Sequence, residues 1–298
     1  MTKSFASVII LNHNGERFIE GCIKSVLAAD YPEKEVIVVD DHSNDGSVRI
    51  VERYHKDVTL RYNNGKRGFA ASANTGIRHS SGEIIVLLNM DTLVDRKWLL
   101  MLVNGMKSDE SIGIVGSKIV YPDWKTIQYA GAYLGKSGLS YHIGRGEIDA
   151  GQYDIPEKVD YACGASIGIR RSVIKEAGYF DEGYCLLYYE EVDFAQRVRR
   201  KGYKVMYIPG SIVSHYENCS VGKYSADFYY LYHKNRIRFV IKNYSLKRFI
   251  LDFVPEERKW FKNATNSERY AALKSYILAM IFSPWLFLRR CLWKLNLI

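Results

Sequence analysis

Apolar residues in the first third of the chain gather in short β-branched runs, and segments of helical spacing separate these runs. The runs predict four strands, at Ala6–Leu11, Glu35–Val39, Val58–Tyr62 and Glu83–Leu88, and the first is typical of a parallel strand covered on both faces. The intervening segments predict helices at Glu16–Leu27, Val48–His55, Phe69–His79 and from Asp95 to about Met106. Alternation of strand and helix predicts an α/β fold with a Rossmann-like, doubly wound, mostly parallel sheet.

The hydrophobic pattern weakens between Ser117 and Asp160, where glycines and tyrosines predict long loops and irregular strands. Regularity returns with an apolar stretch at Tyr161–Ile169, which precedes a short helix near Arg171–Ala177. A stronger helix is predicted from about Glu190 to Lys201. We see no internal repeat and no low-complexity linker in this part of the chain.

The C-terminal part of the chain, from Phe228 onward, is mostly helical in pattern and rich in aromatic and basic residues. We therefore predict an α/β domain over residues 1–240 and a helical extension over residues 241–298. The apolar run from Tyr276 to Leu288 is too short to span a bilayer, and cations follow it. It fits an interfacial helix on an anionic membrane surface, and a core-packing or dimer-forming helix is the alternative.

The net charge of +9 and the pI of about 9.1 favour anionic partners such as nucleic acid, nucleotide phosphates or an anionic membrane. The chain has no zinc-finger spacing, basic zipper or RNA-recognition signature, so we expect no nucleic-acid partner. Five scattered cysteines form no CxxC pair, which argues against a disulfide framework or a zinc site. With no secretory signal at the N-terminus, we expect a cytoplasmic protein.

Acidic side chains follow two of the predicted strands at the point where each strand ends. Asp40 and Asp41 end the second strand, and Asn89 and Asp91 end the fourth. Ligands of doubly wound sheets bind at this edge, so these residues are candidates for binding a nucleotide. The alternative is structural, because an aspartate in such a turn also satisfies loop backbone or caps the next helix.

A divalent cation between two phosphates needs oxygen ligands, and Asp91 is well placed to supply one. One carboxylate alone is a weak metal site, and substrate phosphates normally complete the shell of Mg²⁺. His215, after a strand-like segment, is a candidate second ligand, although a lone histidine is more often structural. Lys66 and Arg67, in a glycine-bounded loop, are candidates for contacting phosphate.

A third acidic group, formed by Glu190, Glu191 and Asp193, begins the predicted helix. The helix dipole stabilises carboxylates at a helix N-terminus, which is a sufficient structural reason for one or two of these three acidic residues. Crowded carboxylates raise one another's pKa, which suits a general base. Glu191 is the candidate base, with Glu190 and Asp193 orienting it or the acceptor. Later in the chain, Lys234 and Arg236 are further candidates for contacting phosphate.

Several short motifs, in this order, resemble the family 2 inverting glycosyltransferases, which have a GT-A type Rossmann-like domain. They cover roughly residues 5 to 240, and the closest likeness is to the rhamnosyltransferase-like branch of bacterial surface-polysaccharide synthesis. The motifs are Ser-Val-Ile-Ile-Leu-Asn-His-Asn-Gly, Val-Val-Asp-Asp-His-Ser-Asn-Asp-Gly-Ser, Leu-Leu-Asn-Met-Asp-Thr, Ile-Gln-Tyr-Ala-Gly, Gly-Tyr-Phe-Asp-Glu, Glu-Glu-Val-Asp-Phe-Ala-Gln-Arg and Ile-Pro-Gly-Ser-Ile-Val-Ser-His. Each motif is weak alone, whereas the ordered set is specific.

The resemblance implies a role for each site residue. Asp40 matches the aspartate that recognises the nucleotide base, with Asp41 beside it, and Asp91 matches the last residue of the DxD metal motif. Glu191 matches the catalytic base, and His215 matches a histidine of the metal–diphosphate site. Mg²⁺ or Mn²⁺ is the implied cofactor. Two departures are Asn-Met-Asp in place of DxD and Glu-Glu in place of the usual Glu-Asp at the base.

The implied reaction is a direct, inverting displacement at the anomeric carbon of a nucleotide-sugar donor, with rhamnose as the favoured sugar. The implied acceptor is a saccharide or a lipid-linked sugar, which suits a protein on the inner face of the cell membrane. A nicotinamide-dependent dehydrogenase shares the fold class, but the first strand–helix turn lacks GxGxxG. A non-catalytic nucleotide- or glycan-binding partner of a transferase remains the alternative.

Overall fold

The computed structural model describes residues 4–65, 67–217 and 225–279. The chain divides into two compact units. The larger unit holds the described residues of Met1–Tyr133, His142–Leu186 and Glu190–Cys219, and the second holds those of Leu134–Tyr141, Leu187–Tyr189 and Ser220–Ile298. By compactness, helix α7 (Ala226–Asn243) groups with the helices that follow it. The predicted boundary, in contrast, follows residue 240, and it stays a prediction.

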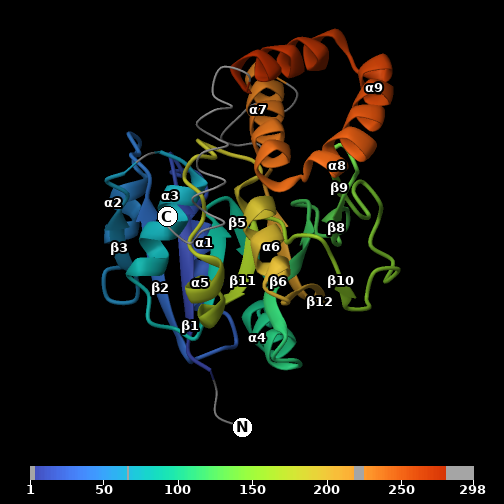
Figure 1. The fold of residues 1–298 in the computed structure, drawn as a ribbon. Coiled ribbons are helices and arrows are strands. Elements are labelled where there is room, and N and C mark those ends of the chain that lie inside the picture. Colours follow the sequence, from blue (N-terminus) through green and yellow to red (C-terminus); the bar gives the residue numbers. More distant parts are fainter. Residues whose placement is uncertain (1–3, 66, 218–224, 280–298) are drawn as a thin grey trace. The chain divides into compact units, whose positions relative to one another are not determined.

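The larger unit is built on a mixed, mostly parallel sheet with the strand order β10-β12-β6-β11-β4-β1-β2-β3 (Figure 1). Two short strands join it from the side, β5 on β12 and β7 on β6. The strands of this sheet are β1 Ala6–Asn12, β2 Lys34–Asp40, β3 Thr59–Tyr62, β4 Ile84–Asn89, β5 Thr92–Val94, β6 Ile112–Val120, β7 Ile127–Tyr129, β10 Glu157–Lys158, β11 Ser166–Arg170 and β12 Lys204–His215. β8 Ala132–Leu134 and β9 Ser140–His142 pair with each other in a separate two-stranded sheet.

The predicted doubly wound sheet is confirmed, and its first four strands match the predicted β-branched runs. β1 pairs in parallel with β2 on one side and with β4 on the other, and β2 pairs in parallel with β3. Every residue of β1 is buried, which is why the run has no polar alternation. The chain order runs from β1 to β2 and β3 on one side and continues with β4 on the other, so the carboxyl ends of β1 and β4 form a topological switch point, where ligands of doubly wound sheets bind.

Two long strands of the sheet were not predicted in full. β6 runs through Val120, so residues 117–120 belong to a regular buried strand and not to an irregular region. Only Ser211–Ser214 of β12 had a strand-like pattern, because Pro209 and Gly210 interrupt the run. At that point the register of β12 against β6 shifts, which accommodates the interruption as a bulge.

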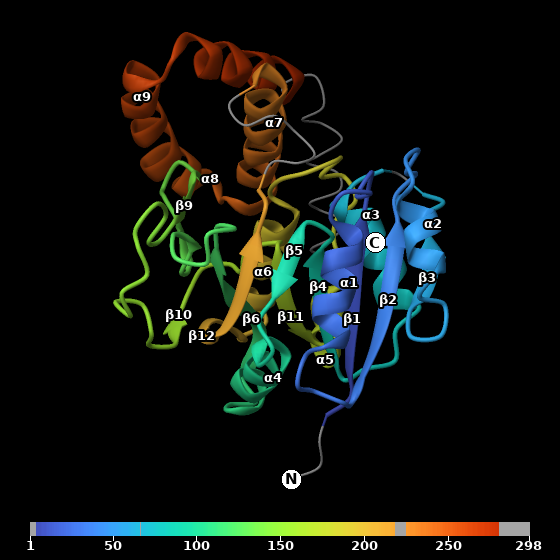
Figure 2. The ribbon, with the colours of Figure 1, turned by 180° about the vertical axis from the view of Figure 1, so that it is seen from behind.

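Helices cover both faces of this sheet. The helices of the larger unit are α1 Ile19–Leu27, α2 Ser47–Glu52, α3 Phe69–Arg78, α4 Trp98–Lys107, α5 Arg171–Ala177 and α6 Glu190–Arg200. α5 and α6 lie in front of the sheet in Figure 1, and α1 lies in front in the reverse view of Figure 2. α3 packs closely on the sheet because Gly76 has no side chain; a Cβ there would lie 2.3 Å from Cγ2 of Ile9.

The strand register brings the predicted polar residues to one edge of the sheet. Asn12 at the end of β1 is opposite Asp40 at the end of β2. On the other side of β1, Leu11 is opposite Asn89 at the end of β4. Asp41 and Asp91 follow directly after this edge. The sequence pattern of polar residues after buried strands therefore converges on one place in the fold.

The second unit is helical, as predicted for the C-terminal extension. It contains α7, α8 (Leu246–Arg248), a π-helical turn η1 (Phe249–Phe253), α9 (Val254–Asn263) and a further helix over residues 266–279. Across the described residues, no helix combines the length and the apolar character needed to cross a membrane. The predicted interfacial run from Tyr276 to Leu288 falls mostly outside the described residues, so membrane binding stays a prediction.

A buried ion pair holds α7 to α9. Arg236 is fully buried, and its two terminal nitrogens donate to the carboxylate oxygens of Glu257 at 2.6 and 2.5 Å. It also donates to the carbonyl of Ser137 at 3.1 Å, and Tyr276 hydrogen bonds to Glu257. The hypothesis that Arg236 contacts a phosphate is therefore wrong, because the guanidinium is buried and already bound within the helical unit.

Candidate active site

Asp40 lies at the carboxyl edge of the sheet and is 3% exposed. Its Oδ1 accepts a hydrogen bond from Nδ2 of Asn12 at 2.8 Å, and its Oδ2 accepts one from the backbone N–H of Ser43 at 3.1 Å. Nδ2 of Asn12 also donates to Ser47 at 3.0 Å, at the start of α2. These bonds hold the loop after β2 in shape. Each carboxylate oxygen keeps a further lone pair for a ligand.

Asp41 organises a second loop at the same edge. Its Oδ1 accepts from Nδ2 of Asn63 at 2.7 Å, and its Oδ2 accepts from the backbone N–H of Gly68 at 2.7 Å. Gly68 has a φ of +119°, and a Cβ at this position would lie 2.6 Å from the carbonyl oxygen of Leu186. The position therefore requires glycine. Asp41 thus connects the end of β2 to the loop that precedes α3.

β5 lies beside β12 in the sheet (Figure 2). This pairing brings Asp91 close to His215, which lies 124 positions later in the sequence. His215 is opposite Thr92 in this ladder, and the backbone N–H of Tyr216 donates to the carbonyl of Asp91 at 3.0 Å. As a result Oδ1 of Asp91 lies 3.4 Å from Nε2 of His215. Both side chains are buried, at 4% and 8% exposure.

Gln128 on β7 sets the tautomer of His215. Nε2 of Gln128 donates to the carbonyl of His215 at 3.2 Å, so its Oε1 faces Nδ1 of the imidazole at 2.7 Å. An amide oxygen only accepts, which requires that Nδ1 carries the proton. In the neutral ring, Nε2 then presents a lone pair toward the Asp91 carboxylate. Two acceptors at this separation can bind a metal ion together.

The residues present therefore fit a divalent cation. A carboxylate oxygen and an imidazole nitrogen held from behind by a third side chain form a typical partial metal shell. Among the described residues, no group of three or more histidine, cysteine or acidic side chains forms a complete cage. The remaining ligands would come from substrate phosphates and water, as is usual for cations that bind nucleotides.

Glu190 and Glu191 begin α6, and their environments differ. Burial raises the pKa of Glu191 from 4.5 for a solvated glutamate to about 7. Its Oε2 is buried and has no hydrogen-bond partner among the residues that the structure describes. The negative charge of Glu191 also adds to the effect of burial in raising the pKa of Tyr129, which follows Gln128 on β7. Glu191 thus has the proton affinity of a general base at neutral pH.

Asp193 has a structural environment. Its carboxylate is fully buried and accepts from Nε of Arg197 at 2.9 Å and from the hydroxyl of Tyr184 at 3.2 Å. Arg197 also donates to the carbonyls of Ala177 and of Tyr179, the latter at 2.8 Å. The pair therefore anchors α6 to the end of α5. These bonds give Asp193 a structural role, and the assignment of the base to Glu191 stays a prediction.

Replacing Arg197 by methionine is expected to lower the free energy of unfolding by about 3–5 kcal/mol, because it leaves the buried Asp193 carboxylate without its counter-ion. Chemical denaturation of the two proteins measures this difference. Lys24→Met is the matched control, since Lys24 and Glu20 have the same i,i+4 spacing but are exposed. No measurable change is expected there. Equal effects of the two substitutions would contradict the structural role of the buried pair.

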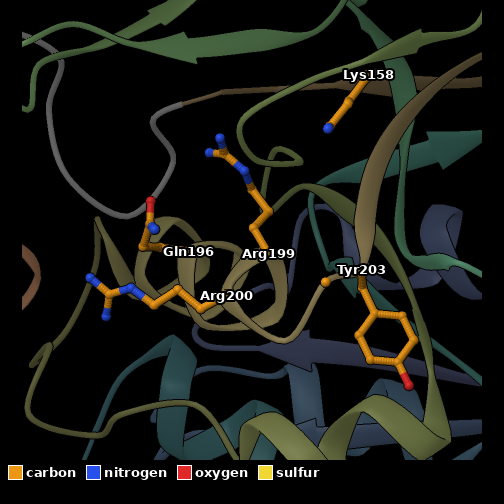
Figure 3. Close-up of a pocket in the computed structure, with 6 residues that line it drawn as sticks. Lys158, Gln196, Arg199, Arg200 and Tyr203 are labelled. Atoms are coloured by element: carbon orange, nitrogen blue, oxygen red, sulfur yellow. The ribbon is translucent and has the colours of Figure 1, made fainter.

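Lys66, a predicted donor contact, lies outside the described residues. A surface pocket of about 280 Å³ lies at the other end of α6 from Glu190 and Glu191 (Figure 3). It is lined by Lys158, Gln196, Arg199, Arg200, Gly202 and Tyr203. None of the predicted site residues lines this pocket. Basic residues in the last turn of a helix are explained by the helix dipole.

Three residues of the site were not singled out from the sequence. Asn12 joins two loops, Asn63 holds Asp41, and Gln128 orients His215. Gln128 belongs to the Ile-Gln-Tyr-Ala-Gly motif, so the sequence pattern included this residue but did not indicate its function. An amide side chain in a loop or short strand has many uses, and its partners are visible only once the strands are paired.

The sequence matches the family model "Glycosyl transferase family 2" over residues 7–178. Among curated proteins, the chain is 24% identical over 212 residues to a poly-beta-1,6-N-acetyl-D-glucosamine synthase of Staphylococcus epidermidis, covering 69% of this chain and 48% of that protein. It is 25% identical over 209 residues to the protein of the same name from Staphylococcus aureus, covering 66% and 46%. The chain thus spans about half the length of these relatives.

Solved structures with the same fold include GalNAc-T7 with UDP, GalNAc and Mn²⁺, at a TM-score of 0.64 and 19% identity, covering 93% of this chain and 57% of that one. A mannosyltransferase of Pyrobaculum calidifontis with GDP-Man and Mn²⁺ has a TM-score of 0.61 and 17% identity, covering 95% and 76%. Staphylococcus aureus TarS with UDP-GlcNAc has a TM-score of 0.58 and 17% identity, covering 91% and 79%. These likenesses show the fold, and the family model, which spans more than half of the chain, shows that this protein belongs to glycosyl transferase family 2.

Proposed function

We propose that this protein is an inverting, metal-dependent glycosyltransferase that moves a sugar from a nucleotide-diphosphate sugar to an acceptor hydroxyl. The observation that carries the proposal is the pair Asp91 and His215 at 3.4 Å, with Gln128 fixing the imidazole so that its lone pair faces the carboxylate. Such a half-complete shell suits a cation whose other ligands are diphosphate oxygens. The pair follows the same sheet edge that carries Asp40 and Asp41.

The donor nucleotide is assigned to the loops after β2 and β3. Asp40 and Asp41 are rigidly held, so their remaining lone pairs point in defined directions and accept from a base N–H or a ribose hydroxyl. Asn89, at the end of β4, lies on the same edge. Lys66 is expected to contact the phosphates. Preorganised acceptors of this kind give selectivity for a nucleotide without a loop rearrangement.

Glu191 is proposed as the base that removes the proton from the acceptor hydroxyl. A pKa near 7 lets it be deprotonated at neutral pH while still binding a proton well in the transition state. The acceptor oxygen then attacks the anomeric carbon on the face opposite the leaving diphosphate, which inverts the configuration. A divalent cation bound by Asp91 and His215 would neutralise the charge that develops on that diphosphate.

The proposal also extends to the identities of the metal ion, the transferred sugar and the acceptor. A carboxylate with an imidazole suits Mn²⁺ better than Mg²⁺, and Mn²⁺ is named in two of the similar structures. Rhamnose, expected from the branch resemblance, stays a prediction. The names of similar proteins contain N-acetylglucosamine and mannose donors instead. A saccharide or lipid-linked acceptor, reached at the inner face of the cell membrane, remains the proposed partner.

Thermal stabilisation by nucleotides tests the proposal directly. We expect UDP, dTDP or GDP to raise the melting temperature only when Mn²⁺ or Mg²⁺ is present, because the diphosphate completes the metal shell. The nucleotide that gives the largest shift selects the donors for a transfer assay, in which dTDP-rhamnose competes with UDP- and GDP-sugars. A shift that is independent of metal, or the absence of any shift, would refute a metal-dependent transferase and favour a non-catalytic binding partner.

A further inference from the structure

The segment that leads into α6 has an unusual backbone. Leu186, Tyr188 and Tyr189 have φ angles of 69°, 77° and 73°, which lie in the left-handed region. Residues with a side chain rarely adopt this conformation, and bulky ones do so at a cost in energy. Such a segment persists only where its surroundings hold it in place. The segment ends directly at Glu190 and Glu191, so its conformation sets where α6 begins.

Asn235, in the middle of α7, holds this segment within the helical unit. Its side chain is fully buried, and its Nδ2 donates to the carbonyls of Leu187 at 2.8 Å and of Tyr188 at 3.0 Å. One amide nitrogen thus uses both of its hydrogens on two successive peptide units. Two bonds to adjacent carbonyls restrict the dihedral angles between them, which is the part of the backbone that is left-handed.

A second group of contacts restrains the last residue of the segment. The hydroxyl of Tyr189 donates to the carbonyl of Gly138 at 2.7 Å, and the ring is 2% exposed. The ring also packs against Phe239, one turn after Asn235 on α7, with centroids 5.8 Å apart. These contacts hold the side chain of Tyr189, whereas the carbonyls of Leu187 and Tyr188 are bound by Asn235. Asn235 therefore contributes a polar restraint on that backbone through two adjacent carbonyls.

We propose that Asn235 is a positioning residue for the catalytic base: by binding the carbonyls of Leu187 and Tyr188 it keeps the left-handed segment in the conformation that presents Glu191. This inference rests on the proposed function, because it assigns Asn235 a part in sugar transfer. Asn235 is not proposed to contact the donor or a metal ligand. It acts through the backbone, and its loss displaces the base without removing it.

Asn235→Asp and Asn235→Ala test the inference. The aspartate keeps the shape of the side chain and loses the donors, and the alanine removes the side chain without adding charge. The control is Asn243→Asp, a buried asparagine of the same helix about 12 Å further along its axis. For both Asn235 variants we expect kcat to fall by about 10- to 100-fold, because a small displacement of a catalytic group has effects of this size. Donor-nucleotide affinity and the KM for the donor should stay within about twofold of wild type.

Hydrogen exchange gives a readout that does not depend on activity. Backbone amides of residues 187–191 should exchange about tenfold faster in both Asn235 variants than in wild type, whereas those of α4 should be unchanged. Unchanged exchange at 187–191, or a fall in kcat no larger than that of Asn243→Asp, would overturn the inference. A wild-type protein that transfers no sugar would instead refute the proposed function, and the exchange result would still decide whether Asn235 restrains the segment.

Discussion

Replacing Glu191 by glutamine is expected to lower kcat for sugar transfer by about 10³-fold, because general base catalysis contributes factors of this order. Glutamine has nearly the same shape but accepts no proton, so nucleotide affinity should stay within about twofold of wild type. Initial rates with the donor chosen by the nucleotide panel measure the first quantity, and calorimetric titration with the nucleoside diphosphate measures the second. A loss of affinity equal to the loss of rate would place Glu191 in donor binding instead.

The pH dependence of wild type provides a separate check on the same residue. Burial raises the pKa of Glu191 to about 7, so the carboxyl group is protonated and inactive as a base below that pH. We expect kcat/KM to fall about tenfold per pH unit on the acid side of pH 7 and to level off above it. A profile that stays flat down to pH 5 would show that this carboxyl group is not the base.

Stability should change in the opposite direction to activity. The folded protein binds the Glu191 proton more tightly than the unfolded chain, whose glutamate has a pKa of 4.5. Stability is therefore lost as pH rises from about 4.5 through 7. Glu191→Gln cannot ionise, so its melting temperature should exceed that of wild type at pH 8 and match it near pH 4. A loss of stability at the pH where the enzyme is active is expected when a carboxylate is kept in a desolvating environment for function.

Glu190→Gln decides which of the two glutamates is the base. Glu190 is buried, at 4% exposure, whereas Glu191 is half-buried, and the two substitutions place the same neutral amide at these adjacent positions. We expect Glu190→Gln to retain at least about a tenth of the wild-type rate and to keep the acid limb of the pH profile. If Glu190→Gln instead abolishes transfer and Glu191→Gln does not, the assignment of the base moves by one residue.

Asp91→Asn is expected to lower kcat/KM by about 10³-fold and to abolish Mn²⁺-dependent nucleotide binding, because a cation that neutralises a leaving diphosphate is worth several kcal/mol. An amide oxygen is a weaker ligand than a carboxylate and supplies no charge. Binding of Mn²⁺ in the presence of nucleotide, followed by electron paramagnetic resonance of the free ion, measures the loss without an activity assay. Metal affinity equal to that of wild type would exclude Asp91 as a ligand.

Two further variants define the metal site around Asp91. Gln128→Leu removes the acceptor that keeps the proton on Nδ1 of His215, and we expect Mn²⁺ affinity to fall by about 10- to 100-fold. Asp95→Asn is the matched control, since Oδ1 of Asp95 accepts from the backbone N–H of Lys97 at 2.8 Å and asparagine can do the same. It should leave metal affinity unchanged. A Gln128→Leu protein that binds Mn²⁺ normally would show that His215 is not held as a ligand.

Local pattern predicted the framework of the fold because β1, β2 and β4 are largely buried strands, whereas β3 at the sheet edge is mostly exposed. A run of mostly apolar residues without regular polar alternation, such as Ala6–Leu11, is typical of a central parallel strand. Polar residues placed directly after such runs must then meet at one edge of the sheet. Asp40, Asp41, Asn89 and Asp91 were therefore placed correctly on this edge before any contact was known.

Long-range pairing decided what these side chains do. Whether Asp193 is a catalytic acid or part of a buried ion pair depends on Arg197 and on the carbonyls after α5, and charge pattern alone does not distinguish the two. Arg236 was misjudged for the same reason, since its partner Glu257 lies 21 residues away. A titratable side chain has the same appearance in sequence whether it is solvated, paired or poised for catalysis.

The amino-acid sequence by itself determined the doubly wound sheet, the sheet edge at which the candidate site residues gather and the family, because these follow from hydrophobic period and from short ordered motifs. Tertiary structure alone decided that β5 meets β12, that Gln128 turns the lone pair of His215 toward Asp91, and that burial brings Glu191 close to neutral pKa. The physical reason is range: period and turn chemistry act over a few residues, whereas desolvation and side-chain hydrogen bonds depend on neighbours that only the folded chain supplies.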